Sequence, residues 1–235
     1  MGLTWKFLVD SLLGMIYPRV CDICGRTLVE GEDIICTACN LDMPRVGIHT
    51  DSFNEMHKRL ACHCPVERAG ALFYYIRDNR YTQLIHHLKY HRRRDIGVSL
   101  GKMVAVEFEP DKFFDGIDLL LPVPIHWTKK ITRGYNQTQL IADGISEITG
   151  IPTGDNIVAR RSHSSQTRKG AAARWVNSDG IYDIDNPREL DGLHVLVIDD
   201  VITTGSTMVR CLDVLHDKAP TAKVSVLSIG LTKLQ

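Results

Sequence analysis

The residues with the clearest capacity for chemistry lie near the C-terminus, where two acids precede a short run of hydroxyl-bearing residues and glycine. Asp199 and Asp200 directly follow the apolar residues 195–198. The run after them contains Thr203, Thr204, Gly205, Ser206 and Thr207. Backbone N–H groups in such a loop, and the positive end of a helix that follows it, bind phosphate. Because carboxylates accept hydrogen bonds from neighbouring hydroxyls, the pattern predicts a sugar site with the 5-phosphate in the loop and the 2- and 3-hydroxyls on the acids.

Other acidic or glycine-rich motifs fit this run less well. The letters VLVIDD also open response-regulator receiver domains, but only 35 residues follow Asp200, too few for the rest of such a domain. A P-loop needs a lysine that is missing after Gly205, and the glycine pattern of a dinucleotide-binding fold is absent. A solvated, Asp-rich turn is the remaining alternative, and a match over thirteen positions argues against it.

A second cluster of reactive side chains lies near the N-terminus, where two Cys-x-x-Cys pairs are separated by eleven residues. The four side chains are those of Cys21, Cys24, Cys36 and Cys39. Each pair places two thiolates on one side of a tight turn, and Gly25 and Asn40 suit the chain reversals that follow. Four thiolates around a zinc ion leave no position for a reactive water, so we predict a structural zinc ribbon.

Disulfides and redox chemistry are the alternative interpretations of these cysteines. Disulfides belong to oxidising compartments, but the apolar stretch Leu3–Ile16 contains Asp10 and no signal-peptide cleavage site follows it. We expect this stretch to form an amphipathic helix, too short to span a membrane, in a cytoplasmic protein. A thioredoxin-like motif would lie beside a strand–helix–strand unit, and the residues around Cys21 show no such pattern.

Three cysteines lie outside the two pairs. Cys62 and Cys64 flank His63, and this group could supply further or alternative metal ligands, although Cys-x-Cys spacing is less typical of zinc sites. Cys211 falls within a helical pattern of apolar residues. We expect it to be buried as a small apolar side chain.

The rest of the chain alternates between strand and helix patterns. Strands are predicted at 69–76 (one strand or a pair), 119–123, 195–198 and 224–229, and helices at 81–90, 98–108, 137–149 and 207–216. This order is typical of an α/β domain with a mostly parallel sheet. We therefore divide the chain into an amphipathic helix, a zinc-ribbon module with its linker, and an α/β domain, at residues 1–17, 18–66 and 67–235.

Overall charge favours no class of partner. The chain has 28 Lys and Arg against 28 Asp and Glu, so any basic surface must be local. One local concentration is the basic run His86–Arg94, which includes Tyr90. Such residues could contact phosphates and stack a base, and a basic helix end in solvent is the alternative interpretation.

The run from Val195 to Thr207 resembles the signature of type I phosphoribosyltransferases, which bind 5-phosphoribosyl pyrophosphate (PRPP). That signature has four apolar residues, two acids, two apolar residues and then T-T-G-x-T, and the sequence matches it throughout. With the Cys pairs and the stretches Pro122–Gln137, Gln166–Arg168 and Arg174–Asn177, essentially the whole chain is similar to the ComF/GntX family. Its members are described as predicted amidophosphoribosyltransferases or as competence proteins used in DNA uptake. The resemblance implies a type I phosphoribosyltransferase fold, a mostly parallel sheet flanked by helices, plus a small N-terminal zinc ribbon with four cysteine ligands.

The resemblance also implies roles for residues outside the acid pair. A loop after an early strand binds pyrophosphate in this fold, which corresponds here to Pro124 and the stretch after it. The cations of Lys129 and Arg133 would then stabilise charge on the departing pyrophosphate, although Lys129 could equally be a solvated loop residue. A flap that closes over the substrate would span Arg160–Asn177. Its cations Arg168, Lys169 and Arg174 could reach the diphosphate on closure, and Arg168 and Arg174 are preferred because both match the family's pattern.

The implied reaction is a glycosyl transfer at the anomeric carbon of PRPP, with pyrophosphate leaving and an acceptor attacking. Mg²⁺ would be held mainly by the diphosphate and water, with carboxylates assisting. No glutaminase domain that could supply ammonia is recognisable. The alternative function is a non-catalytic module that handles single-stranded DNA, through the basic run, or senses PRPP. Competence proteins are possible partners.

Overall fold

The computed structural model describes residues 18–47, 53–60, 65–125, 133–160 and 181–233. The helix expected at 1–17 lies outside these ranges. Within them, no helix has both the length and the apolar character needed to cross a bilayer.

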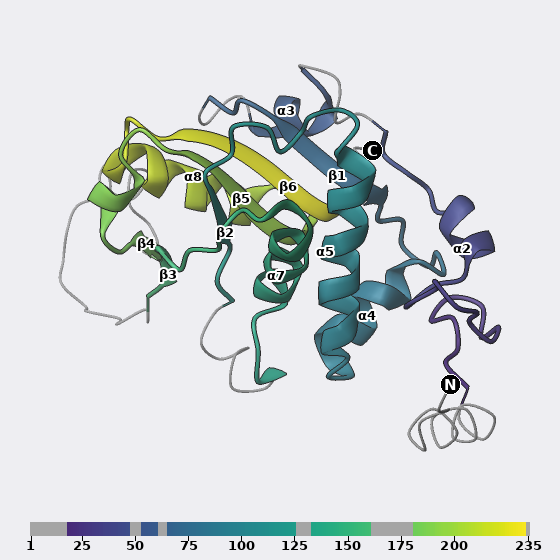
Figure 1. Cartoon of the computed structure of the whole chain (residues 1–235). Helices are drawn as coiled ribbons and strands as arrows, with labels where there is room; N and C mark the ends of the chain where they lie inside the picture. Colours follow the sequence, from purple (N-terminus) through teal and green to yellow (C-terminus); the bar gives the residue numbers. More distant parts are fainter. Residues whose placement is uncertain (1–17, 48–52, 61–64, 126–132, 161–180, 234–235) are drawn as a thin grey trace, which may run out of the picture.

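A four-stranded parallel sheet forms the centre of the molecule (Figure 1). Across the sheet the strands follow the order Ala69–Tyr74 (β1), Lys223–Leu231 (β6), His194–Ile202 (β5) and Leu119–Pro122 (β2). Val197 of β5 is paired with Val226 of β6 and with Leu121 of β2. The four predicted strands and their parallel arrangement are confirmed, and the stretch 69–76 contains a single strand.

Helices cover both faces of the sheet, which explains why its strands are apolar on both sides. The four longest are α4 (Thr82–Tyr90), α5 (Arg94–Phe108), α7 (Gln137–Thr149) and α8 (Ser206–Lys218). Alternate side chains of β5 point to opposite faces. Leu196 and Ile198 pack with α4, α5 and α7, whereas Val195 and Val197 pack with α8 on the other side (Figure 1). All four predicted helices are confirmed.

The backbones of α5 and α7 approach each other very closely where they cross. A Cβ atom added to Gly101 would lie 2.1 Å from the carbonyl oxygen of Ile141, and one added to Gly144 would lie 2.1 Å from that of Val98. Side chains at these two positions would have to displace backbone atoms, so glycine is needed there for space and not for an unusual φ.

Several short elements have no counterpart among the predicted ones. They are α2 (Thr37–Leu41), α3 (Glu55–Leu60), the 3-10 turn η2 (Pro187–Leu190) and the antiparallel pair β3 (Ile157–Ala159) and β4 (Tyr182–Ile184). Strands of three residues are too short to carry a periodic signal. The pair is fastened to the domain at Asp183, which forms ion pairs with Lys218 of α8 and with Arg160.

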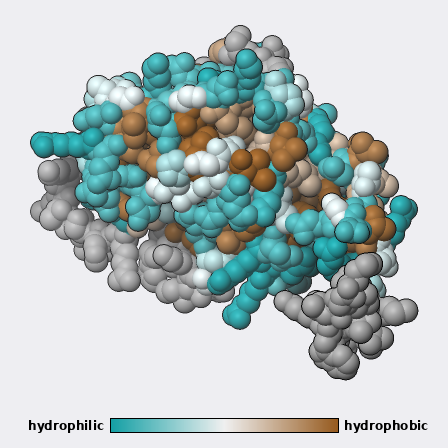
Figure 2. Space-filling model, in the orientation of Figure 1, coloured by the Kyte–Doolittle hydropathy of each residue, from teal (hydrophilic) through white to brown (hydrophobic). Residues whose placement is uncertain are grey.

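The face that carries α5 and α7 is mostly hydrophilic, with smaller apolar patches between the polar groups (Figure 2). Val106 on α5 is one of the exposed apolar residues, at 61% of its full exposure. Scattered apolar groups of this kind are normal on a protein surface and indicate no particular function.

Candidate functional site

The acid pair lies inside β5 and not in the loop that follows it. The strand continues to Ile202, because Val201 and Ile202 pair with Gly230 and Leu231 of β6. Asp200 is 9% exposed, and its backbone N–H donates to Oδ1 of Asp199 at 2.8 Å. Both carboxylates therefore occupy the carboxyl end of a central parallel strand, where ligands bind in open α/β sheets.

The hydroxyl-rich loop turns directly into α8. Gly205 adopts φ +85°, a left-handed conformation that favours glycine, and the helix begins at Ser206. The backbone N–H of Ser206 donates to Oγ1 of Thr204 at 3.4 Å. A small hollow is formed by Asp199, Val201, Ile202, Thr203, Gly205, Ser206, Thr207 and Met208. The structure thus brings one carboxylate, the loop and the N-terminus of a helix of thirteen residues around one space.

The loop is held from outside by Arg59, a residue that the sequence patterns did not single out. Its guanidinium donates to the carbonyl oxygen of Thr203 at 2.5 Å and to that of Thr232, the residue after β6. Nη2 also lies 2.6 Å from a carboxylate oxygen of Glu55, and the Arg59 side chain is 3% exposed. No motif marks Arg59, because its partners come from segments about 144 and 173 residues away in the chain.

Replacing Arg59 with methionine is expected to lower the free energy of unfolding by about 2–3 kcal/mol, since two backbone carbonyls lose a charged donor. Urea denaturation measures the change. Arg188→Met is the control: its side chain is exposed on η2, and we expect a change within about 0.5 kcal/mol. Equal stability of the two variants would show that Arg59 does not hold the loop.

The stretch expected to bind pyrophosphate begins beside the acid pair. Val123 follows β2, and its N–H donates to the carbonyl oxygen of Ile198, the residue before Asp199. Two side chains at the start of α7 hold the Val123 carbonyl, through Nδ2 of Asn136 at 3.2 Å and Oγ1 of Thr138 at 2.6 Å. Pro124 comes next and is half-buried. The fold therefore places the start of this stretch beside the acids, at the carboxyl ends of the strands.

Arg133 lies against the end of α4. Its guanidinium carbon is 5.2 Å from the ring centroid of Tyr90, and Nη1 donates to Oε1 of Gln137 at 3.2 Å. Three other predicted cations, Lys129, Arg168 and Arg174, lie outside the described residues, so their roles stay predictions. The same holds for the Cys62–Cys64 group.

The residue next to Tyr90 reaches the acid pair. Nζ of Lys89 lies 2.9 Å from Oδ1 and 2.9 Å from Oδ2 of Asp200. The sequence offered only a weak signal for this contact, because Lys89 stands within a basic run that is equally consistent with a solvated helix end. The pairing depends on how α4 docks against the sheet and not on any local motif.

The four paired cysteines form one cluster. Their Sγ atoms all lie within 4.8 Å of one another, and Sγ of Cys24 is 3.7 Å from Sγ of Cys36. Sulfurs around a tetrahedral zinc with bonds of about 2.3 Å are about 3.8 Å apart, so the spacing fits such an ion. None of the cysteines that the structure describes forms a disulfide. The cluster could hold a metal ion such as zinc.

The two pairs reach this arrangement by different backbone routes. The first is a tight turn in which the N–H of Gly25, at φ +72°, donates to the carbonyl oxygen of Cys21 at 2.9 Å. The second pair enters a helix, because Cys36 precedes α2 and Cys39 lies within it. The sharp chain reversal expected at Asn40 is therefore wrong. Asn40 is helical, and its Oδ1 accepts a hydrogen bond from Nη2 of Arg45 at 2.7 Å.

The thiols differ strongly in acidity. Burial acts to raise the pKa of Cys21, but backbone N–H groups of Cys36, Cys24 and Ile23 outweigh it and lower this pKa to about 7. Burial and the neighbouring thiols raise the pKa of Cys39 well above its usual value. A thiol with a lowered pKa gives up its proton more readily, as binding to a metal ion requires. Cys211 is fully buried on α8 and burial raises its pKa, as expected for an inert apolar side chain.

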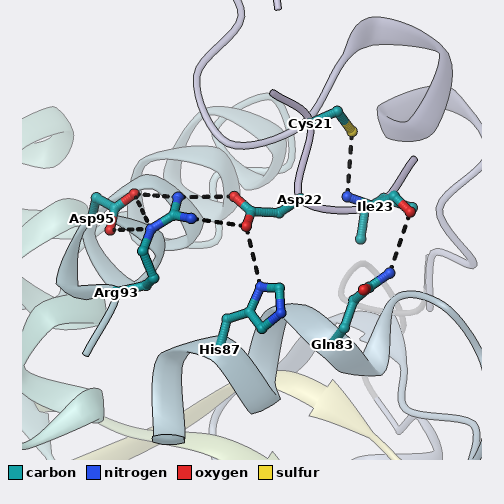
Figure 3. Close-up of polar contacts among 7 residues, drawn as sticks. All are labelled: Cys21, Asp22, Ile23, Gln83, His87, Arg93 and Asp95. Atoms are coloured by element: carbon teal, nitrogen blue, oxygen red, sulfur yellow. Dashed lines mark hydrogen bonds and ion pairs between the residues drawn. The ribbon is translucent and has the colours of Figure 1, made fainter. Parts of the chain in front are cut away.

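The cysteine module docks on the end of α4 through Asp22, which lies between Cys21 and Ile23 (Figure 3). Nη1 of Arg93 donates to Oδ1 of this carboxylate at 3.0 Å, and Nη2 donates to Oδ2 at 2.9 Å. Nδ1 of His87 lies 3.1 Å from Oδ1. The Asp22 side chain is only 6% exposed. Gln83, one turn before His87, donates to the carbonyl oxygen of Ile23 at 3.3 Å.

These contacts account for much of the basic run. Lys89 is paired with Asp200, and Arg93 is paired with Asp22 and Asp95. Arg94 lies over the ring of Tyr135, with 5.1 Å between the guanidinium carbon and the ring centroid. The run therefore serves largely to join the cysteine module, α4 and the acid pair.

Comparison with known proteins identifies the domain. Residues 129–231 match the family model of the phosphoribosyl transferase domain. The parallel sheet, with an acid pair at the end of β5 and a loop leading into α8, agrees with this match. The chain thus carries a phosphoribosyltransferase domain.

Relatives of similar length narrow the identification. DNA utilization protein YhgH of Salmonella typhimurium is 25% identical over 222 residues, covering 91% of this chain and 90% of that protein. Competence protein ComFC of Bacillus subtilis is 29% identical over 222 residues, covering 93% of this chain and 80% of that protein. Among solved structures, glutamine PRPP amidotransferase from B. subtilis has 22% identity and a TM-score of 0.42, over 60% of this chain and 30% of that one. These relatives support the resemblance to the ComF family.

Proposed function

We propose that the site at the end of β5 binds PRPP with Mg²⁺ and transfers its phosphoribosyl group to an acceptor. One observation carries the proposal: Asp199, the loop residues Thr203 and Gly205, and the start of α8 surround a single hollow. Loop N–H groups and the helix end would bind the 5-phosphate. Asp199 and Asp200 would accept hydrogen bonds from the 2- and 3-hydroxyls.

The proposed reaction breaks the bond between the anomeric carbon and the diphosphate oxygen. The electron pair leaves with pyrophosphate, the acceptor forms the new bond to carbon and loses its proton to solvent, and positive charge builds on the ribose ring in between. A bound Mg²⁺ supplies charge neutralisation for the diphosphate. The two carboxylates orient the ribose, and Arg133, Lys129, Arg168 and Arg174 are proposed to stabilise the departing anion.

We propose zinc as the ion of the four-cysteine cluster, with a structural role, in a cytoplasmic protein. The supporting observations are the spacing of the sulfurs and the lowered pKa of Cys21. The proposed units are an N-terminal helix at 1–17, the ribbon and linker at 18–66 and the transferase domain at 67–235.

The alternative function is a non-catalytic module for single-stranded DNA, or for PRPP sensing, in competence. The exposed Tyr90 favours it, because this ring lies beside the Arg133 guanidinium and 4.8 Å from the His86 ring, measured between ring centroids. An exposed aromatic ring next to a guanidinium can stack a base. The names of the YhgH and ComFC relatives refer to DNA utilization and competence.

Calorimetric titration with PRPP and Mg²⁺ tests the proposal. We expect micromolar binding that is weakened at least about 100-fold in Asp199→Asn/Asp200→Asn, since each charged hydrogen bond contributes about 1.5–3 kcal/mol. The matched control is Asp213→Asn/Asp217→Asn, two exposed acids on α8, which should bind as the wild type does. Absence of binding by the folded wild type would sink the proposal and leave the DNA-binding module as the better hypothesis. Where binding is seen, pyrophosphate release in the presence of candidate acceptors separates an enzyme from a sensor.

A further inference from the structure

The contact between Lys89 and Asp200 joins the last turn of α4 to the proposed substrate site. The ammonium group lies at 2.9 Å from both oxygens of the carboxylate. The lysine side chain is 22% exposed and that of the aspartate 13% exposed. A largely buried carboxylate is stable only with a counter-charge, and Lys89 supplies it.

The backbone around Lys89 is fixed from two sides. The hydroxyl of Tyr135, in the loop before α7, donates to the carbonyl oxygen of Leu88. On the other side, Asp22 of the cysteine module holds His87 and Arg93. The lysine side chain, in contrast, has a flexible four-carbon stem and three donor positions, so it can move while the helix stays in place.

The ion pair between Lys89 and Asp200 has different consequences for the binding of ribose ligands with and without a diphosphate. A ribose hydroxyl that binds Asp200 must approach an oxygen that Lys89 now contacts, so the ammonium group has to share that oxygen or give up part of its contact. A ligand without a diphosphate gives the displaced ammonium group no new partner nearby. A ligand with a diphosphate next to the same ribose does, because a lysine can turn from a carboxylate to a phosphate oxygen while keeping its charge paired.

From this geometry we propose that Lys89 contacts the substrate. When a ribosyl diphosphate binds, the ammonium group of Lys89 leaves the carboxylate of Asp200 and binds the diphosphate. The inference rests on the proposed function and adds a source of specificity to it. Lys89 would oppose binding of ribose 5-phosphate and favour binding of PRPP, so that the site selects the sugar that carries the leaving group.

Calorimetry with two ligands, PRPP and ribose 5-phosphate, both with Mg²⁺, tests this role in Lys89→Met. We expect the Kd for PRPP to rise at least about tenfold, as for loss of one charged hydrogen bond. The Kd for ribose 5-phosphate should stay the same or fall. Lys89→Arg, which keeps the charge, should bind PRPP within about threefold of the wild type. Lys102→Met is the matched control, because Lys102 forms an exposed ion pair with Glu147 of α7.

Each outcome decides between the two proposals. If the wild type binds PRPP and Lys89→Met binds it equally well, the role of Lys89 is wrong and the proposed function stands. If both ligands lose affinity equally, Lys89 only maintains the fold, and thermal unfolding of the variant would show the loss of stability. If the folded wild type binds neither ligand, the proposed function itself fails.

Discussion

Loss of metal from the four-cysteine cluster is expected to unfold the cysteine module and to loosen α4 at a distance. Structural zinc contributes about 10–16 kcal/mol to small folded modules of this kind. Residues 18–47 contain one helix, the five-residue α2, so apart from the cluster their fold depends on loop hydrogen bonds and on apolar side chains such as Ile34 and Ile35 that pack into the core. Without the module, Asp22 no longer fixes His87 and Arg93, so the end of α4 that carries Lys89 loses one of its two supports.

The measurement is amide hydrogen exchange on Cys21→Ser/Cys36→Ser beside the wild type, with zinc content determined on both. In the variant, protection in residues 18–47 should be lost, and exchange in α4 should rise about 10–100-fold, as for a local opening. Cys211→Ala, a buried cysteine outside the cluster, should keep one zinc per chain. A wild type that is purified without zinc, yet is protected throughout the module, would contradict the proposed ion.

Gly101→Ala is expected to lower the free energy of unfolding by about 3 kcal/mol. Alanine favours a helix over glycine by about 1 kcal/mol, so helix propensity alone predicts the opposite sign. The added Cβ would lie 2.1 Å from the carbonyl oxygen of Ile141, a backbone atom that cannot turn aside as a side chain does. The α5–α7 crossing must therefore open, and Thr138 would shift relative to the Val123 carbonyl.

Urea denaturation measures this change as well. Val106→Ala is the control on the same helix, because that side chain faces solvent, and we expect a change within about 0.5 kcal/mol. A more stable Gly101→Ala variant would mean that the two helices are not in backbone contact in solution.

The elements that could be predicted from the sequence are those whose burial leaves a periodic pattern. Residues 195–198 are apolar because the strand is covered on both faces, and α7 ends at Gly150 in the left-handed conformation that glycine favours. The strand's last residues were missed because Asp199 and Asp200 interrupt the apolar run, although Val201 and Ile202 still pair with β6.

The contacts that complete the candidate site could not be predicted in the same way. Lys89 and Asp200 are 111 residues apart, and Arg59 and Thr203 are 144 apart. Each pair forms only when separate elements dock, so neither Lys89 nor Arg59 could be recognised from a local motif. The acid pair and the cysteine pairs were recognisable because their chemistry depends on neighbours in the sequence.

The order of the strands also constrains when the sheet can form. β6, at Lys223–Leu231, lies between β1 and β5, and among the described strands it is the only neighbour of β1. A chain emerging from the ribosome can pair β5 with β2, but β1 stays without its partner until β6 has been made. About 150 residues are therefore synthesised between β1 (Ala69–Tyr74) and its partner strand. During that time the edge of this apolar strand can contact other chains. Assembly of the sheet is for this reason a late event, which follows synthesis of nearly all the residues that the structure describes.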